Sequence, residues 1–436
     1  MNLQNLKSIF EKEGCTKVYV KKLSPNDNSK NQVYLGGSFE ILNIFPISDI
    51  QNVEAGDWNR ERFKASVNFA WLNDDGKIYP APQSQLILYP KYPEVRFSGF
   101  LHKCENAPSA LMTQRLEGRL LFLGVSKSGL VIGYVTVSDS EIAQEFNGNM
   151  PGDSVGIFKI IELSQSLNSK EKLLSELRRI HELDWILSKR LDKTGRPMEC
   201  NSSNCGGYTL EAELGIIPNG ISEPDYLGWE VKQFGVPNFT RISSSVITLM
   251  TPEPTDGFYK TAGTGNFLRR YGYSDKTGRE DRINFGGVHK VGSRHPSTNL
   301  ELQLVGYDHE AGKIRNSNGK ISLIDLNGDE AASWSFSSLL QHWTRKHNQA
   351  CYVPSLSNTV KDRMYKYGDT VILGMGTDFQ LFLNQMALGN IYYDPGIKME
   401  NVSVKPKIKK RSQFRIKSQH LGTLYKANEI VSVTRR

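Results

Sequence analysis

The stretch of sequence that decides the fold is Thr209-Leu-Glu-Ala-Glu-Leu-Gly-Ile-Ile-Pro-Asn-Gly-Ile-Ser-Glu-Pro-Asp-Tyr-Leu-Gly-Trp-Glu-Val-Lys232. Its last part predicts a β-strand in which Glu230 and Lys232, two residues apart, project from the same face. Asp225 comes earlier, directly after a proline, and is expected at the mouth of that strand. Gly228 lies between them and permits a bend. The pattern therefore predicts two carboxylates and one amine gathered at one end of a strand.

This combination of side chains suits the hydrolysis of a phosphodiester bond. Mg²⁺ prefers oxygen ligands and typically takes one or two carboxylates plus waters. Asp225 and Glu230 offer those carboxylates, and the Val231 carbonyl oxygen is a third candidate ligand. The metal would neutralise charge on the scissile phosphate and lower the pKa of a bound water. Lys232 would orient that water and stabilise the transition state. We therefore expect a Mg²⁺ cofactor, with Mn²⁺ able to substitute.

The spacing of this motif is selective within the chain. The only other acidic-X-Lys triplet is Asp75-Gly76-Lys77, which lies in a polar turn with no acidic residue four to twelve positions upstream. The triplet at Glu230 has both the upstream Asp225 and apolar neighbours. An ordinary strand with a surface ion pair stays open as the alternative.

Length and composition indicate a two-domain globular protein. The 436 residues exceed one ordinary domain, and 38% hydrophobic with 23% charged residues is typical of globular chains. Residues 1–165 carry 17 Lys or Arg against 18 Asp or Glu, so the net charge of +8 comes entirely from the remainder. A basic surface favours a phosphate-rich partner, although many basic proteins bind no nucleic acid.

The domain boundary is expected near residue 165, where the sequence pattern changes. Before it, short runs of β-branched and aromatic residues alternate with turn signals, which is typical of a barrel or sandwich. These runs are Lys17–Val20, Phe39–Leu42, Ala65–Phe69, Gln85–Leu88, Leu120–Val125 and Leu130–Val135. After it, leucines and isoleucines recur at helical spacing over residues 169–191, with Ser169 as the expected N-cap.

Cysteine usage predicts a reducing compartment. The five cysteines are scattered, and Cys200 and Cys205 have no second Cys or His pair close by, so free thiols are expected in place of a zinc site. No run of 18 apolar residues and no apolar leader at the N-terminus are present, so neither a membrane span nor a signal peptide is expected. We expect a bacterial cytoplasmic protein with no membrane partner.

The spacing from Leu210-Glu211 through Asp225 to Glu230-Val231-Lys232 resembles the MvaI/BcnI restriction endonucleases, relatives of the MutH nicking enzyme. The segments 246–255, 392–396 and 410–416 look similar to that family as well, so the resemblance covers residues 166–436. It implies a PD-(D/E)XK nuclease fold, an α/β structure with a mixed sheet. It also implies Glu211 as an additional acidic residue near the metal, with Glu213 as the alternative if the register differs by two.

The first 165 residues resemble the B3-like effector domains of the EcoRII type, which implies an all-β pseudobarrel with short helices. Two stretches look like DNA-reading arms, in which lysines would meet phosphates and polar side chains would read base edges. The arms comprise Lys21, Lys22, Asn26, Asp27, Lys30 and Gln32, then Lys91, Glu94 and Arg96. Ordinary polar loops are the alternative for both arms.

Two further basic segments are candidate DNA contacts. Residues 405–417 hold seven basic residues and no acidic one, which favours an ordered DNA-contacting strand over a disordered tail. From this region and from a basic glycine-containing loop we select Arg411, Arg415, His420, His289, Arg294 and His295. A solvated loop is an equal alternative for the last three. Trp334, Trp343 and Phe336 are expected in the core.

Together these resemblances imply a type II, type IIE-like restriction endonuclease that cuts double-stranded DNA at a short site, with CCWGG favoured. Its expected partners are two copies of that site and a cognate methyltransferase in the cell, and the enzyme is expected to be a monomer. A MutH-like nicking enzyme and a B3-type regulator without catalysis are the alternatives. The three carboxylates at Glu211, Asp225 and Glu230 favour the nuclease, because a protein that only binds DNA has no use for them near phosphates.

Overall fold

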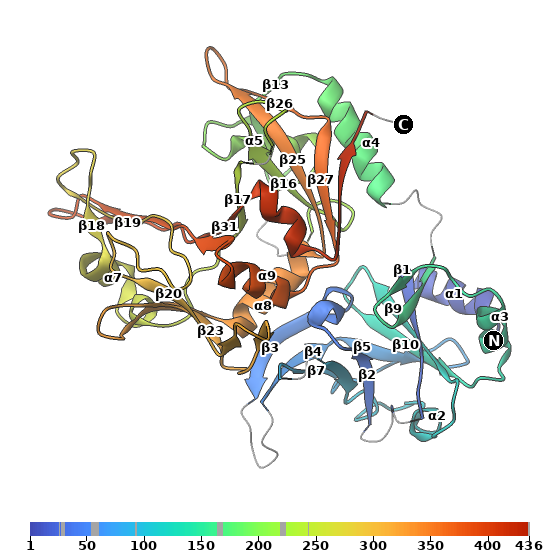
Figure 1. Ribbon diagram of the computed structural model, residues 1–436. Coiled ribbons are helices and arrows are strands. Elements are labelled where there is room, and N and C mark those ends of the chain that lie inside the picture. Colours follow the sequence, from blue (N-terminus) through green and yellow to red (C-terminus); the bar gives the residue numbers. More distant parts are fainter. Residues whose placement is uncertain are drawn as a thin grey trace. The chain divides into compact units, whose positions relative to one another are not determined.

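The computed structural model describes residues 1–25, 27, 31–53, 61–91, 94–163, 169–218, 224–242 and 244–434 (Figure 1). The chain divides into two compact units, Met1–Ser166 and Leu167–Arg436. Each unit is described by itself below. Among the described residues, no helix is both long and apolar enough to cross a membrane.

The first unit is built from two β-sheets with short helices. One sheet has the order β11-β12-β1-β9-β10-β5-β6, with bounds Ser154–Val155, Phe158–Glu162, Cys15–Lys22, Leu120–Ser126, Val131–Thr136, Phe69–Leu72 and Ile78–Pro80. The other has the order β2-β8-β7-β4-β3, with bounds Gln32–Gly36, Glu94–Ser98, Gln85–Tyr89, Arg62–Val67 and Ile47–Val53. The helices are α1 (Leu3–Lys12), η1 (Phe39–Asn43), α2 (Ser109–Thr113) and α3 (Glu141–Gly148). The all-β character expected for this part of the chain is confirmed.

Continuous apolar runs supply the core of this unit. Every residue of β10 is buried, as are most of β9, because both strands lie inside the larger sheet. The run Phe39–Leu42 was expected to be a strand and instead forms the 3₁₀ helix η1. Phe39, Ile41 and Leu42 are all buried there, so a one-turn helix hides the same apolar side chains that a strand would have hidden.

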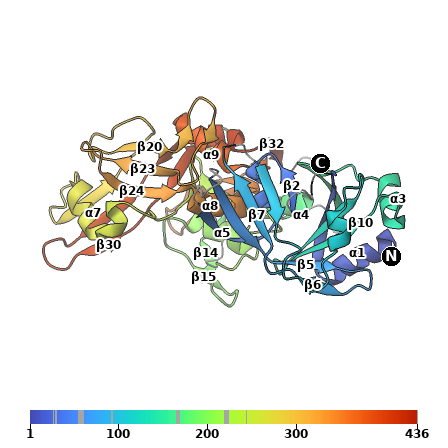
Figure 2. The ribbon, with the colours of Figure 1, turned by 90° about the horizontal axis from the view of Figure 1, so that it is seen from below.

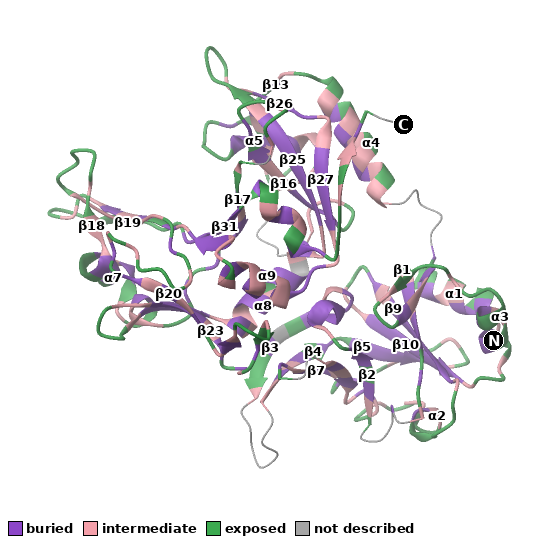
Figure 3. Cartoon of the chain, viewed as in Figure 1, coloured by how far each residue is buried: buried purple, intermediate pink, exposed green. Residues whose placement is uncertain are grey.

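The second unit contains a mixed sheet that carries the candidate site. Its strand order is β13-β26-β25-β27-β32, with β16 paired to β25, and the bounds are Ile186–Leu187, Met364–Tyr367, Gln349–Asn358, Thr370–Met375, Ala427–Ser432 and Glu230–Gly235. The β16–β25 pairing is parallel, whereas the other pairings in the sheet are antiparallel. Figure 3 shows β25 and β27 as largely buried. The expected mixed sheet is confirmed.

Helix α4 (Ser169–Glu182) packs against this sheet but is shorter than expected. Its buried residues Leu173, Leu177 and Ile180 join Val231 and Val353 in one core cluster. The expected helix to residue 191 is wrong, because Asp184 adopts a positive φ and the chain continues into the short strand β13. The expected N-cap also differs: Ser169 is the first helical residue, and its hydroxyl accepts a hydrogen bond from the Trp229 indole.

The remainder of the second unit holds smaller sheets and helices (Figure 2). The sheets, in strand order, are β14-β15 (Lys189–Leu191, Pro197–Glu199), β17-β31-β28 (Val246–Met250, Phe414–Lys417, Ile391–Tyr393), β18-β19-β29-β30 (Tyr273–Ser274, Arg282–Gly286, Gly396–Glu400, Lys407–Lys409), β20-β23-β24 (Glu301–Val305, Lys320–Ile324, Glu330–Ser335) and β21-β22 (Tyr307–Asp308, Lys313–Ile314). The helices are α5 (Cys205–Glu213), α6 (Phe258–Thr261), α7 (Gly263–Tyr271), α8 (Phe336–His347), α9 (Phe379–Ala387) and η2 (Ser418–Leu424). The basic segment 405–417 is therefore ordered as β30 and β31, and Trp334, Trp343 and Phe336 are fully buried, as expected.

The structure corrects one expectation about the cysteines. Cys200 and Cys205 are joined by a disulfide across a short loop, with their Cα atoms 5.7 Å apart, whereas free thiols were expected. The loop folds back because the Cys200 backbone pairs with Ser188 at both its N–H and its carbonyl oxygen. Cys15, Cys104 and Cys351 are free.

Candidate active site

A tight turn places Asp225 beside the first residues of β16. Tyr226 and Trp229 exchange both backbone hydrogen bonds, so Leu227 and Gly228 are the two central residues of a hairpin turn. Both have positive φ, 49° and 87°, a conformation that glycine adopts freely and leucine does not. The strained turn returns the chain so that Asp225 Oδ2 accepts a hydrogen bond from the Val231 N–H at 3.2 Å.

Glu230 and Lys232 meet on one face of β16, as their spacing predicts. Lys232 Nζ donates to Glu230 Oε1 at 2.8 Å. The Glu230 side chain is only 4% exposed and that of Lys232 19%. The second oxygen, Glu230 Oε2, is buried and accepts no hydrogen bond. A buried, incompletely bonded carboxylate is costly, so this oxygen is a candidate for binding a cation.

Helix α5 decides which of the two candidate glutamates faces this pair. Glu213 forms ion pairs with Lys189 and Arg179, away from the cluster. Glu211 interacts electrostatically with both Glu230 and Lys232. The two residues are two positions apart on a helix, so they project in different directions. The structure therefore favours Glu211 over Glu213 as the additional acidic residue near Asp225 and Glu230.

A glycine in the first turn of α5 lies against a side chain of β16. A Cβ atom at Gly206 would lie 2.8 Å from Gln233 Oε1 of β16, which is too short for an ordinary contact. The Gly206 carbonyl oxygen also accepts a hydrogen bond from the Tyr367 hydroxyl. Gly206 therefore leaves room for the end of the Gln233 side chain against the first turn of α5.

Two basic residues at the end of α8 reach the same site and were not found from the sequence. Lys346 Nζ lies 3.9 Å from Glu230 Oε2. His347 is buried, stacks on Trp343 and pairs through Nε2 with the Leu249 carbonyl oxygen. They lie more than a hundred residues after Lys232, and no local pattern links the two segments.

The charges of these groups shift one another's pKa values. Burial raises the pKa of Asp225 to about 7, with the charge of Glu230 adding to the rise. Burial and Glu230 also raise the pKa of Glu211. Burial acts to raise the pKa of Glu230 too, but the positive charges of Lys232 and its neighbours outweigh it, and that pKa is lowered. At neutral pH, Glu230 and Lys232 therefore form an ion pair. Asp225, whose pKa is about 7, is only partly ionised at that pH.

The donor set is chemically suited to a divalent cation. Among the described residues, no group of three or more His, Cys, Asp or Glu is gathered closely enough to enclose a metal ion. Asp225 and Glu230 still provide two carboxylates, one with an unbonded buried oxygen, and Mg²⁺ commonly takes one or two carboxylates plus waters. A bound cation would also favour the ionised form of Asp225.

In the first unit, several residues expected to read DNA line one hollow of about 540 Å³. They are Lys21, Lys22, Asp27, Gln32 and Arg96. Arg96 forms an ion pair with Glu94, which is half-buried, and Lys91 is exposed. Asn26 and Lys30 lie outside the described residues. Arg96 of the second expected arm thus lies at the same hollow as the described residues of the first arm.

Two members of the first arm have interior roles. The Asp27 carboxylate is buried and accepts hydrogen bonds from Lys21 Nζ at 2.6 Å, Ser24 N–H and Tyr34 N–H. Lys21 is only 5% exposed. The expectation that these two side chains contact DNA directly is therefore revised. Although both border the hollow, they bind each other and hold the arm in shape, whereas Lys22, Gln32 and Arg96 are more exposed.

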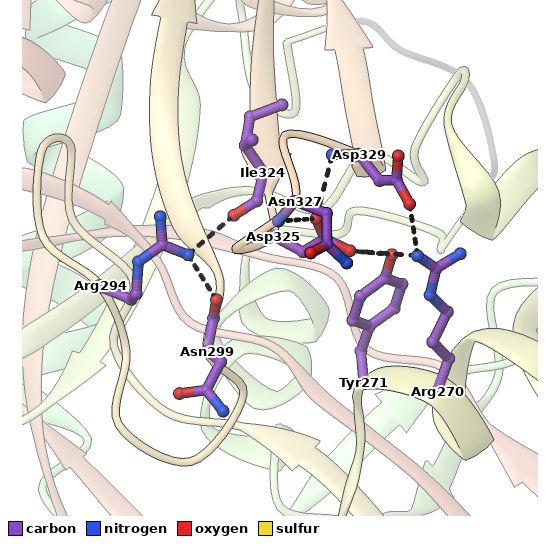
Figure 4. Close-up of polar contacts among 8 residues, drawn as sticks. All are labelled: Arg270, Tyr271, Arg294, Asn299, Ile324, Asp325, Asn327 and Asp329. Atoms are coloured by element: carbon purple, nitrogen blue, oxygen red, sulfur yellow. Dashed lines mark hydrogen bonds and ion pairs between the residues drawn. The ribbon is translucent and has the colours of Figure 1, made fainter.

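The loop 289–299 is likewise held by its own basic residues. His289 is fully buried, with Nδ1 paired to the Gly287 carbonyl oxygen and Nε2 to the Thr298 hydroxyl, so it has no surface to offer DNA. Its ring stacks on His295, which is half-buried. Arg294 donates to the carbonyl oxygens of Asn299 and Ile324 (Figure 4). His289 is therefore revised as a candidate DNA contact, whereas Arg294 is exposed.

The remaining candidates lie on or next to β31. Arg415 pairs with Asp394 at 2.6 Å. Arg411 is exposed, and its side chain packs near Gly396. His420, in η2, is half-buried and its ring pairs with the Gln419 amide. Arg411 is the most accessible of the three.

The mixed sheet thus presents a Glu-X-Lys pair, with an aspartate at the strand mouth and a glutamate on the adjacent helix. The sequence profile of the MvaI/BcnI restriction endonuclease family matches residues 174–425. The chain belongs to this family and is thus a site-specific DNA endonuclease, which confirms the resemblance noted from the sequence.

Solved structures of MvaI are similar to part of the chain. The complex of MvaI with its cognate DNA substrate is 20% identical, covers 62% of this chain and 100% of its own, and has a TM-score of 0.45. MvaI in the absence of DNA is also 20% identical with the same coverage, at a TM-score of 0.34. No curated protein sequence matches the chain.

Proposed function

We propose that this protein is a Mg²⁺-dependent type II restriction endonuclease that hydrolyses both strands of double-stranded DNA, with Asp225, Glu230, Lys232 and Glu211 in its active site. The observation that carries the proposal is the Glu230 carboxylate. One of its oxygens accepts from Lys232, the other is buried without a described hydrogen-bond donor, and the carboxylate acts electrostatically on Asp225.

Each residue of the proposed active site has a separate role in hydrolysis. Asp225, Glu230 and the Val231 carbonyl oxygen would hold the cation, which when bound supplies charge to the scissile phosphate and activates a water. Lys232, held by Glu230, orients the attacking water and faces the charge that develops on phosphorus-bound oxygens. Glu211 adds a carboxylate from α5 at the edge of the same site.

Digestion of supercoiled plasmid tests the proposal. With Mg²⁺ or Mn²⁺ we expect linear product, whereas Ca²⁺ should support binding only, because its larger and looser coordination positions water poorly. Asp225→Asn should lose at least ~10²-fold in rate while still binding DNA. An open circle as the final product would instead indicate a nicking enzyme, and an unchanged plasmid a regulator without catalysis. Full activity in EDTA would contradict the metal requirement.

For the first unit we propose a B3-like effector domain that reads a second copy of the same site, with CCWGG the favoured sequence. The hollow lined by Lys22, Gln32 and Arg96 supports this, because lysine suits phosphate while arginine and glutamine suit base edges. Two DNA sites on one chain make the second engagement intramolecular, at an effective concentration that reaches the millimolar range.

A comparison of plasmids with one and two sites tests the effector role. We expect faster cleavage of the two-site plasmid, and stimulation of the one-site plasmid by a short duplex added in trans. Equal rates with no stimulation would reject it. The proposed enzyme acts as a monomer alongside a cognate methyltransferase, so a nicked intermediate should appear as one active site cuts the strands in turn.

A further inference from the structure

Lys346 makes an unusual contact with the buried carboxylate of Glu230. Its Nζ lies 3.9 Å from Glu230 Oε2, which is beyond hydrogen-bond distance, and Oε2 accepts no hydrogen bond from any other described group. Lys232, in contrast, donates to Oε1 at 2.8 Å. The Lys346 side chain is 30% exposed against 4% for Glu230. Lys346 therefore lies at the solvent side of the site, attracted to Glu230 by charge but not tied to it.

The backbone beneath Lys346 is firmly anchored. The next residue, His347, stacks on Trp343 with ring centroids 4.2 Å apart and pairs with the Leu249 carbonyl oxygen. The Trp343 indole N–H donates to the Thr377 hydroxyl. These contacts at the end of α8 fix the Cα position of Lys346. Its long aliphatic stem still allows the ammonium to move between Glu230 and a DNA phosphate.

The charges of the site favour a second positively charged side chain, besides Lys232, next to the substrate phosphate. Three carboxylates, those of Glu211, Asp225 and Glu230, interact electrostatically with Lys232 and Lys346. A DNA phosphate brought to this cluster would be repelled by the carboxylates, and Lys232 is already engaged with Glu230. An ammonium that is partly exposed and not hydrogen-bonded to Glu230 can turn to the incoming phosphate at little cost.

We propose that Lys346 is a phosphate-binding residue of this active site: in the DNA-free protein it partners Glu230, and in the complex its ammonium contacts a phosphate at or next to the scissile bond. This inference rests on the proposed function. It assigns to α8 a catalytic contact made from outside the segment that carries the other site residues.

The experiment compares Lys346→Met, which keeps the aliphatic stem, and Lys346→Arg with a matched control. Lys366→Met is the control, because Lys366 has a similar exposure of 31% and an ion pair with Asp184 elsewhere in the same unit. Single-turnover cleavage in Mg²⁺ and DNA affinity in Ca²⁺ at several salt concentrations are measured for each protein. Thermal unfolding confirms that the variants fold.

For Lys346→Met we expect a loss of about 10²-fold in the single-turnover rate at saturating DNA, because a donor that faces transition-state charge is removed. The slope of log Kd against log salt should also fall by ~0.9, the value for one lost phosphate contact. Lys346→Arg should recover part of the rate, and the control should match the wild type in both readouts.

Several outcomes would overturn the assignment. Cleavage by Lys346→Met at the wild-type rate would reject a phosphate contact, and so would an unchanged salt slope. An equal loss in Lys366→Met would show a general effect of charge. A wild-type protein that neither binds nor cuts DNA would refute the proposed function itself, so the two failures are distinguishable.

Discussion

Replacing Lys232 with methionine separates the structural role of this residue from its catalytic role. The change keeps the aliphatic stem and removes the ammonium that donates to Glu230 Oε1 at 2.8 Å. The carboxylate left behind is 4% exposed, and its other oxygen already accepts no hydrogen bond. Breaking one side of a buried ion pair costs about 3–5 kcal/mol, and the lower end applies here because Lys346 still lies near.

The cost should depend on pH in a defined direction. In the wild type the pKa of Glu230 is lowered, so its ionised form contributes stability above its ordinary pKa of 4.5 that is lost as the pH falls further. Without Lys232, burial dominates and the pKa of Glu230 rises. The variant then binds a proton more readily when folded, so the difference from the wild type should be large near neutral pH and shrink toward pH 4.5.

Urea unfolding of the wild type, Lys232→Met, Glu230→Gln and the double variant measures this coupling. The double variant should regain most of the lost stability, because replacing both partners leaves no unpaired buried charge. It should remain inactive in single-turnover cleavage, since the metal ligand and the amine are both gone. If Lys232→Met unfolds at the wild-type urea concentration, or if it cleaves at a comparable rate, the reasoning about this pair is refuted.

Three further predictions concern other parts of the molecule. The double variant Cys200→Ser/Cys205→Ser should lose about 2 kcal/mol of unfolding free energy, because the disulfide no longer restricts a loop of this size in the unfolded chain. A reductant should lower the unfolding free energy of the wild type by the same amount and leave that of the variant unchanged. Arg96→Ala should weaken the binding of site-bearing duplex by the first unit by ~1–3 kcal/mol if Arg96 reads a guanine, and fluorescence anisotropy on a catalytically inactive background would show no change if it does not. Burial lowers the pKa of His289 from 6.5 to about 4, so its neutral form contributes up to about 3 kcal/mol of stability above pH 6.5, and this contribution is lost as the pH falls toward 4. His289→Gln should therefore flatten the dependence of the unfolding free energy on pH between 6.5 and 4. An unchanged dependence would contradict the assignment.

Local sequence determined the strand and the pair of side chains at its centre. The period of two in a strand places Glu230 and Lys232 on one face whatever surrounds them, and their contact follows from that period. Gly228 predicted a bend before β16. The positive φ of its neighbour Leu227 could not be predicted from the local sequence, because leucine rarely adopts that conformation. The apolar runs of the first unit likewise predicted most of its strands, because burial on both faces requires such runs.

Tertiary structure decided the features that depend on distant partners. Helix α4 ends at Glu182 although the leucine stripe continues, because the following residues pair with β26 instead. His289 looks like an accessible basic residue in sequence, yet packing against Phe285 and His295 buries it.

The same division holds within the active site. A helical segment with two glutamates two positions apart leaves the choice between Glu211 and Glu213 open, and only the ion pairs of Glu213 with Lys189 and Arg179 settle which face it occupies. Lys346 enters the site because the β16–β25 pairing brings the end of α8 next to Glu230. Periodicity acts over a few residues and is readable in the sequence, whereas contacts between segments a hundred residues apart depend on how the sheet is assembled.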